Sequence, residues 1–374
     1  MGLVAVAVLL AIIAASIALT GVGLYREWKF WSSDERFPQS CKSVDVIVPL
    51  KGAPQGLEEN LSAIVGQRTT ARPRYIFVVD DEGDPAYSLA SKFGEVVVAG
   101  RRDDVPGKSW ALARALGRVS GDCVVLADDD IRPGPQWLES LTAPLSTYEA
   151  STTYRWYVGR GLCTRARAAV SNTAFTAMQH PKSRFLWGGS MALRREVVHK
   201  GGLPERLPRY ISDDYAVYET VRELGGRIWF SKAAIAPTPD PECRWKDMFK
   251  WAVRQILMVK WYSRRGWIAG LVIYTLGFVF GIVVPTAGLA LGEPALSLGF
   301  VLPLLNLAKD FVRARGVERW TGVRTRAGEV LATWALGNLV IPATIWASAF
   351  VKCVVWRGRR YCEGDAKRLV VNFK

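Results

Sequence analysis

The stretch VVLADDDIRPGPQW at residues 124–137 decides the fold of the central part of this 374-residue chain. An apolar run ends in three consecutive carboxylates, Asp128, Asp129 and Asp130, and a turn containing proline and glycine follows at once. Adjacent carboxylates repel one another and are costly to bury without partners. The stretch therefore predicts a buried strand that ends at a site where a positively charged group binds.

Apolar runs of strand length alternate with segments of helical spacing on the N-terminal side of this stretch. The predicted strands are 44–50, 75–80, 95–99 and 123–127, and the predicted helices are 56–67, 85–93 and 108–118. This alternation predicts an α/β, Rossmann-like domain in which helices cover both faces of a parallel sheet.

Polar residues follow three of the predicted strands, at 49–52 (PLKG), 80–82 (DDE) and 128–130 (DDD). A single acidic strand end is usually a solvated turn. Ligands of such sheets, however, bind at the carboxyl ends of the strands, and two acidic ends from adjacent strands would meet in one crevice. Gathered carboxylates suit a hard divalent cation that keeps phosphate as a further ligand.

The phosphate-binding motifs of two common enzyme classes are absent. Neither GxxxxGK[ST] nor GxGxxG follows the first strand, which argues against a P-loop nucleotidase and a dinucleotide enzyme. Pro106, Gly107 and Lys108 precede a predicted helix instead, and a helix N-terminus with a lysine attracts phosphate. The alternative for Lys108 is an ordinary surface lysine in a turn.

Three apolar blocks predict membrane segments, at 3–25, 268–308 and 329–355. The first is long for a cleaved signal peptide and lacks a preceding basic residue, which favours a retained anchor. Residues 292–294 (GEP) divide the second into a helical hairpin, and Pro342 predicts a kinked or partly interfacial third block. The predicted organisation is an anchor at 1–25, a domain outside the bilayer at 26–267 and a membrane region at 268–374.

The formal net charge is +15, from 49 basic and 34 acidic residues. Nucleic acid is one partner that such a charge allows, but an anionic lipid surface suits a chain with membrane segments at both ends, so we expect no nucleic acid. Basic residues cluster beside the apolar blocks, which predicts that 26–267 and the 309–328 loop are cytoplasmic. Four full crossings would place the basic tail WRGRRY (356–361) outside; either one segment does not cross or the tail breaks the tendency.

The six cysteines form no CxxC pair and the chain has two histidines, which argues against a structural zinc site. Scattered cysteines predict free thiols in a reducing compartment.

The order of the motifs resembles that of nucleotide-sugar glycosyltransferases of the GT-A fold, family 2 and its relatives, and most of all ceramide glucosyltransferases. The motifs that carry the resemblance are VPLKG at 48–52, DDEGDPA at 80–86, PGKSWAL at 106–112, LADDDIRP at 126–133, GGSMALRRE at 188–196, SDDY at 212–215 and WRGRRY at 356–361. They extend over nearly the whole chain.

The resemblance implies a role for each acidic motif. Asp81 is expected on the uracil side of the nucleotide, and Asp128 and Asp130 are expected to hold the diphosphate through Mg²⁺ or Mn²⁺. Asp214 is expected to be the catalytic base, although the family more often has Glu-Asp where this chain has Asp213-Asp214. We expect Asp213 or Ser212 to cap the helix that follows, and the helix N-terminus to keep the pKa of Asp214 low.

The family motif Gln/Arg-x-x-Arg-Trp has two imperfect counterparts, Lys250-Trp251 and Lys260-Trp261, and neither keeps the arginine. The sequence KWAVRQILM favours the first pair, with Arg254 and Gln255 also able to reach the active site. Lysine supplies a point charge to phosphate but lacks the bidentate fork of arginine.

Further residues complete the predicted site. Pro49, Lys51 and Lys108 are expected to bind the donor. Gly188 and Gly189 permit close approach of sugar or acceptor, and Asp213 is expected with them in the acceptor region. The segment 151–200 contains several arginines and is expected to rest on the bilayer or to shape an acceptor pocket.

The predicted function is inverting, metal-dependent transfer of a hexose, with UDP-glucose as the default donor, to a lipid acceptor in the bilayer. Ceramide, another diol or glycerol lipid and a polyprenyl phosphate all remain open as acceptors. The alternatives are a polyprenyl-phosphate glycosyltransferase, a processive polysaccharide synthase and a non-enzymatic membrane scaffold. The sequence does not fix the oligomeric state.

Overall fold

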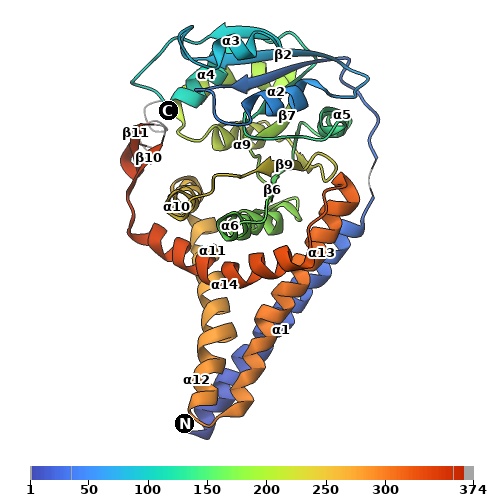
Figure 1. Ribbon diagram of the computed structural model, residues 1–374. Helices are drawn as coiled ribbons and strands as arrows, with labels where there is room; N and C mark the ends of the chain where they lie inside the picture. The colour runs from blue at the N-terminus through green and yellow to red at the C-terminus, as the bar shows by residue number, and fades with distance from the viewer. Residues whose placement is uncertain (1, 35, 357, 366–374) are drawn as a thin grey trace. The chain divides into compact units, whose positions relative to one another are not determined.

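The computed structural model describes residues 2–34, 36–356 and 358–365 (Figure 1). Two compact units make up the chain. The helical unit comprises Met1–Asp34, Gly159–Thr173 and Asp240–Val354, and the sheet unit comprises Glu35–Val158, Ala174–Pro239 and Val355–Lys374. Helix α6 (Leu162–Met178) belongs to both units.

A seven-stranded sheet in the order β3-β2-β1-β4-β7-β5-β8 forms the centre of the sheet unit. Its strands are β1 (Ser43–Pro49), β2 (Arg72–Val79), β3 (Glu95–Val98), β4 (Cys123–Ala127), β5 (Ala150–Thr152), β7 (Ser190–Arg194) and β8 (Ile228–Phe230). The four predicted strands are confirmed and parallel. The prediction of a parallel sheet is wrong for the other strands, because β7 runs antiparallel to both β4 and β5. Apolar composition reveals a buried strand but not its direction.

The register of the sheet brings the polar strand ends to one edge. Pro49 pairs with Val78 across β1 and β2, and Ile47 pairs with Leu126 across β1 and β4. The residues that follow β1, β2 and β4 therefore emerge at one edge, as the sequence predicts. The acidic ends of β2 and β4 do not come from adjacent strands, as we expected, because β1 lies between them.

Helices α2 (Leu57–Val65), α3 (Tyr87–Ala90) and α4 (Gly107–Leu116) confirm the three predicted helices, and α5 (Trp137–Thr142) follows β4. On α2, Leu57, Leu61 and Ile64 have the spacing of one helix face and are fully buried in the core beside β1 and β4. This burial fixes the strands whose ends carry the polar residues.

The second half of the sheet unit adds short elements that the sequence did not resolve. They are η1 (Ala143–Ser146), α7 (Arg195–Lys200), α8 (Leu203–Arg206), η2 (Leu207–Arg209) and the parallel pair β6 (Arg155–Val158) and β9 (Ala236–Pro239). Helix α9 (Asp213–Glu223) confirms the helix predicted after Ser212. Strands β10 (Cys353–Trp356) and β11 (Arg359–Cys362) form a separate two-stranded sheet near the end of the described residues. Arg357, within the predicted tail motif, lies outside the described residues.

The helical unit contains four helices that are long and apolar enough to cross a membrane, counted over the described residues. They are α1 (Leu3–Ser32), the segment Arg264–Ala290, the segment Pro294–Thr321 and α14 (Ala327–Phe350). The segment Arg264–Ala290 consists of α11 (Arg264–Phe278), η3 (Val279–Val283) and α12 (Val284–Ala290). The segment Pro294–Thr321 consists of η4 (Pro294–Phe300) and α13 (Val301–Thr321). Figure 1 shows α1 and α13 side by side, whereas α14 runs across the others. Helix α10 (Trp245–Tyr262) packs against α11 and α14.

A buried ion pair joins α1 to α13. The Arg313 guanidinium donates from Nε and Nη2 to the two carboxylate oxygens of Glu27, each at 2.9 Å, and Glu27 is fully buried. Trp31 also donates to Glu27, at 2.8 Å. Arg313, which the sequence placed among the basic loop residues, is therefore an internal partner of the anchor helix.

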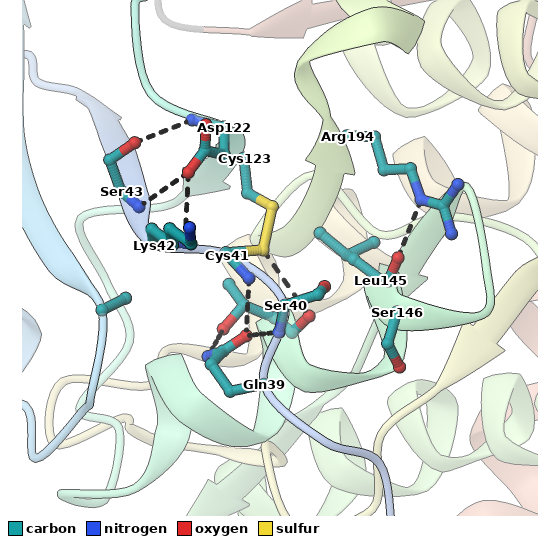
Figure 2. The surroundings of a disulfide bond; sticks show 12 residues. Gln39, Ser40, Cys41, Lys42, Ser43, Asp122, Cys123, Leu145, Ser146 and Arg194 are labelled. Atoms are coloured by element: carbon teal, nitrogen blue, oxygen red, sulfur yellow. Dashed lines mark hydrogen bonds between the residues drawn. A yellow bond between two sulfur atoms is a disulfide. The ribbon is translucent and has the colours of Figure 1, made fainter.

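The prediction of free thiols is wrong. Cys41 is bonded to Cys123 and Cys163 to Cys243, and Cys353 and Cys362 are also disulfide-bonded. Figure 2 shows the first bond where the chain enters β1, next to the start of β4. The bonded partners are 82 and 80 residues apart, so no local motif reveals them. The inference of a reducing compartment loses its basis with the free thiols.

Candidate active site

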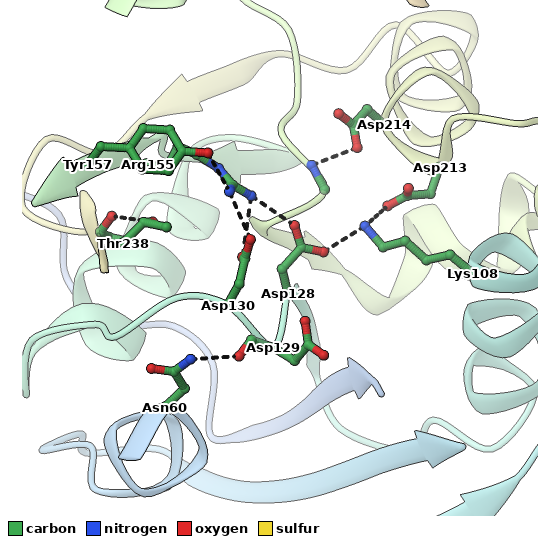
Figure 3. A network of polar contacts seen from close by, with 12 residues as sticks. Asn60, Lys108, Asp128, Asp129, Asp130, Arg155, Tyr157, Asp213, Asp214 and Thr238 are labelled. Atoms are coloured by element: carbon green, nitrogen blue, oxygen red, sulfur yellow. Dashed lines mark hydrogen bonds and ion pairs between the residues drawn. The ribbon is translucent and has the colours of Figure 1, made fainter. Parts of the chain in front are cut away.

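Asp128 and Asp130, directly after β4, share one guanidinium (Figure 3). Arg155 donates from Nη2 to Asp128 Oδ2 at 3.2 Å and from Nη1 to Asp130 Oδ2 at 2.9 Å. Its Nη2 also approaches Asp130 Oδ1 at 3.4 Å. The two carboxylates predicted to hold a cation thus face the same point in space.

Arg155 is the first residue of β6 and is itself buried, with its side chain 10% exposed. Its Nη1 donates to Tyr157 Oη at 3.1 Å, and its guanidinium lies 4.8 Å from the centre of the Trp187 ring. Burial lowers the pKa of the Arg155 guanidinium, but the interactions with Asp130, Tyr157 and Asp128 together outweigh burial and raise the pKa above its usual range. Arg155 is therefore a permanent cation at this site.

Lys108 supplies the second cation, from the first turn of α4. Its Nζ lies 2.8 Å from Asp128 Oδ1 and 3.1 Å from Asp213 Oδ2. Burial favours the neutral amine, yet the charges of Asp128 and Asp213 outweigh burial and raise the pKa of Lys108. The alternative of a free surface lysine is wrong, since Lys108 ties the end of β4 to the start of α9.

Asp213 and Asp214 begin α9, and they point to different partners. Asp213 is buried against Lys108, whereas Asp214 Oδ1 accepts a hydrogen bond from the Gly188 amide at 2.8 Å. The Ser212 side chain makes no capping hydrogen bond, so the expected cap is not formed by its hydroxyl.

Desolvation by burial, and next the charge of Asp213, raise the pKa of Asp214 to about 8. The expectation of a low pKa is therefore wrong: at this helix start burial outweighs the helix dipole. Once ionised, a carboxylate with such a pKa is a stronger proton acceptor than an ordinary aspartate, although most of it is protonated at neutral pH.

The backbone before β7 approaches these aspartates closely. A Cβ atom at Gly188 would overlap the carboxylate oxygens of Asp214 and Asp213, so only glycine fits there. The neighbouring Gly189 carbonyl accepts from the Asp128 amide at 3.1 Å. Gly188 and Gly189 thus join the two acidic motifs, whether or not they also contact an acceptor.

The donor set fits a hard divalent cation. Among the described residues, no group of three or more His, Cys, Asp or Glu side chains gathers as a metal site. Two carboxylates that can share one cation, with Asp130 52% exposed, are nonetheless sufficient when substrate phosphates supply further oxygens.

The residues predicted to bind the nucleotide lie at or just after the ends of β1 and β2. Pro49 ends β1, and Lys51 Nζ lies 3.0 Å from Asp80 Oδ2. Asp81 is exposed, and its carboxylate accepts from the Gly83 amide at 2.9 Å. These residues form the same edge of the sheet as Asp128.

The remaining predicted residues lie on α10, in the helical unit. Lys250 and Gln255 are exposed, Arg254 is partly buried, and Trp251 has the Arg167 guanidinium 5.6 Å from its ring centre. In the competing pair, Lys260 Nζ donates to the Ser348 and Ala349 carbonyls at the end of α14. Lys260 therefore has a structural task, which favours Lys250 for the family position.

Sequence reasoning missed Arg155 as a site residue and grouped it with other arginines of 151–200. The alternation in 154–157 (YRWY) carried the signal, because a strand points alternate residues to opposite sides. Tyr154 and Trp156 both pack on Phe175, while Arg155 and Tyr157 turn toward Asp130. Segment 151–200 is thus part strand, and not solely an interfacial helix.

A family model described as Glycosyl transferase family 21 matches residues 7–367. The chain belongs to glycosyl transferase family 21. It is therefore a glycosyltransferase, and the non-enzymatic scaffold is wrong. No curated protein matches this family 21 chain.

One solved structure similar to this family 21 member is the mannosyltransferase PcManGT from Pyrobaculum calidifontis in complex with GDP-Man and Mn²⁺. The two chains are 18% identical, the TM-score is 0.49, and the match covers 91% of this chain and 97% of that chain. Glucosyl-3-phosphoglycerate synthase from Mycobacterium tuberculosis in complex with phosphoglyceric acid is similar at 19% identity, with a TM-score of 0.40 and coverage of 59% of this chain and 79% of that chain.

Proposed function

We propose that this family 21 enzyme transfers a hexose, with glucose from UDP-glucose as the first donor to test, to a hydroxyl group of a membrane lipid with inversion at the anomeric carbon. The observation that carries the proposal is Asp214, a carboxyl group with a raised pKa beside a glycine that leaves it room. It directly follows Asp213, which is joined through Lys108 to the Asp128–Asp130 pair.

In this proposal Asp214 takes the proton of the acceptor hydroxyl as the oxygen attacks the sugar. Asp128 and Asp130 would hold Mg²⁺ or Mn²⁺, which when bound supplies positive charge to the departing diphosphate. Lys108 keeps Asp128 and Asp213 in place and adds a positive charge at the start of α4. Lys51 and Asp81, at the neighbouring strand ends, are proposed to contact the nucleotide.

The fold of the helical unit supports three membrane crossings rather than four. Helix α14 runs across α11 and α13, so we propose that it lies in the membrane interface. The basic tail then returns to the side of the sheet unit. Arg359 of that tail donates to Asp103 of the sheet unit at 3.1 Å, which requires both to be on one side. We propose that this side is cytoplasmic, in keeping with the basic residues near the apolar helices.

A polyprenyl-phosphate acceptor is the second candidate, because it is also a membrane lipid and the site contains arginines and lysines that attract phosphate. A processive polysaccharide synthase is less well supported, since three crossings leave few helices to form a channel.

Lipid mass spectrometry tests the proposal. We expect the enzyme, expressed in a host that lacks glycolipids, to add one hexose to a host or added lipid, and the Asp214→Asn variant to add none. Purified protein with UDP-glucose, Mn²⁺ and ceramide, diacylglycerol or polyprenyl phosphate separates the acceptors. The absence of any hexosyl lipid with all three, under conditions in which UDP binds, would refute a lipid acceptor.

A further inference from the structure

The proposed reaction leaves unexplained why a buried arginine occupies the centre of the predicted cation site. All four carboxylate oxygens of Asp128 and Asp130 face protein cations. One Asp128 oxygen lies 2.8 Å from Lys108 Nζ, and the other lies 3.2 Å from Arg155 Nη2. Both Asp130 oxygens lie within 3.4 Å of the Arg155 guanidinium.

Arg155 is held in this position by more than its charge partners. Its backbone is part of the parallel pairing of β6 with β9, in register with Ala236. Its guanidinium lies over the Trp187 ring and donates to Tyr157 Oη. With a side chain only 10% exposed, it cannot turn into solvent without losing these contacts.

A divalent cation that bridges the two carboxylates needs the oxygens that Arg155 now uses, and it meets a like charge next to them. We propose that Arg155 is a built-in counter-cation that competes with the divalent cation for Asp128 and Asp130, so that the metal ion binds tightly only together with the nucleotide diphosphate. The nucleotide in this statement rests on the proposed function, whereas the competition rests on Arg155, Asp128 and Asp130 alone.

The diphosphate removes the conflict for two chemical reasons. Its oxygens complete the coordination of a cation that two carboxylates hold incompletely. Phosphate also accepts the same forked pair of hydrogen bonds from a guanidinium that a carboxylate accepts. Arg155 can therefore exchange carboxylate oxygens for phosphate oxygens while it remains buried and paired.

Binding of Mn²⁺ to the purified full-length protein, followed by electron paramagnetic resonance with and without UDP, tests the proposal. We expect UDP to tighten Mn²⁺ binding by wild-type protein by at least about tenfold. Arg155→Gln should bind Mn²⁺ at least about tenfold more tightly than wild type without UDP, because the competing charge is gone. Arg155→Lys keeps the charge and should stay close to wild type.

Two controls test whether the change in Mn²⁺ affinity is specific to Arg155 and depends on Asp130. Arg184→Gln removes another buried arginine, one that donates to the Met178 and Ile228 carbonyls, and should leave Mn²⁺ binding unchanged. In Arg155→Gln/Asp130→Asn the gain in affinity should disappear. Thermal unfolding of each variant establishes that it is folded.

Equal Mn²⁺ affinity of folded Arg155→Gln and wild type would overturn the proposal. If Arg155→Gln does not fold, the wild-type titration still decides, since Mn²⁺ binding as tight without UDP as with it contradicts competition. None of these measurements needs sugar transfer. Failure to form a hexosyl lipid, with the Mn²⁺ results as expected, would refute the proposed function and leave the role of Arg155 standing.

Discussion

The raised pKa of Asp214 gives the proposed base a distinctive pH dependence. With a pKa of about 8, only about one tenth of the enzyme carries an ionised Asp214 at pH 7 and about one hundredth at pH 6. If the ionised form is the base, kcat/KM for the free enzyme should rise about tenfold per pH unit up to pH 8 and then level off.

Substitutions at Asp214 and Asp213 test the role of Asp214 as the base and the contribution of the Asp213 charge to its raised pKa. Asp214→Asn should lower turnover by about 10²-fold or more with little effect on UDP-sugar binding. Asp213→Asn removes the neighbouring negative charge, the second cause of the raised pKa, and should move the rise of kcat/KM to lower pH. Initial rates across pH 5.5–9.5 in one buffer mixture at constant ionic strength measure both effects. A kcat/KM that is flat between pH 6 and 8, or an unchanged profile in Asp214→Asn, would refute this assignment.

Stability should change with pH in the opposite sense to activity. Because the folded pKa of Asp214 lies above the unfolded value of 3.8, neutral Asp214 favours the folded state. That contribution is complete below about pH 4 and is lost as pH rises through about 8. The fall in Tm over this window should be smaller in Asp214→Asn, and a steeper fall in the variant would contradict the burial of this carboxyl group.

Three further predictions follow from named contacts. Gly188→Ala should lower turnover by about tenfold or more and disturb UDP binding less, because its methyl group overlaps the carboxylate of Asp214; steady-state kinetics that match wild type would remove the need for glycine there. Asp130→Asn should nearly abolish metal-dependent transfer and leave a folded protein by circular dichroism, whereas full activity after EDTA treatment would exclude the cation. Cys41→Ser/Cys123→Ser should lower the free energy of unfolding by about 2–5 kcal/mol, measured by denaturant titration against wild type under oxidising conditions; an unchanged midpoint would show that this bond contributes nothing.

The first half of the sheet was predictable because its signals are local. Runs such as 44–50 and 123–127 are apolar and short, and β1 and β4 are completely buried at their centres. That the acidic strand ends share one edge was predictable, since parallel strands bring their carboxyl ends together, but the position of β1 between β2 and β4 was not. The direction of β7 was not, because the pairing that sets it joins segments more than sixty residues apart.

The electrostatics of the site were less accessible from the sequence. The pKa of Asp214 depends on burial, which the printed residues do not reveal, and local reasoning saw only the helix start. Arg155 lies 25 residues beyond Asp130, so their ion pair exists only because β6 folds back against the end of β4. The disulfides were missed for the same physical reason, because partners about eighty residues apart leave no spacing motif.

The charge balance of the site links these separate features. Four carboxylates, those of Asp128, Asp130, Asp213 and Asp214, lie in this site with the cations Lys108 and Arg155, so negative charge is in excess among these six described residues. A diphosphate that entered this network alone would add negative charge to a site that already has an excess of it. Protonation of Asp214 at neutral pH removes part of that excess, and a divalent cation removes the rest. Because each of these events eases the binding of the donor, linkage requires that the donor in turn favours each of them. Donor binding should therefore tighten metal binding. Without metal, the donor should raise the pKa of Asp214 further. The cation should lower the pKa of Asp214, so that its ionised form becomes available to accept a proton.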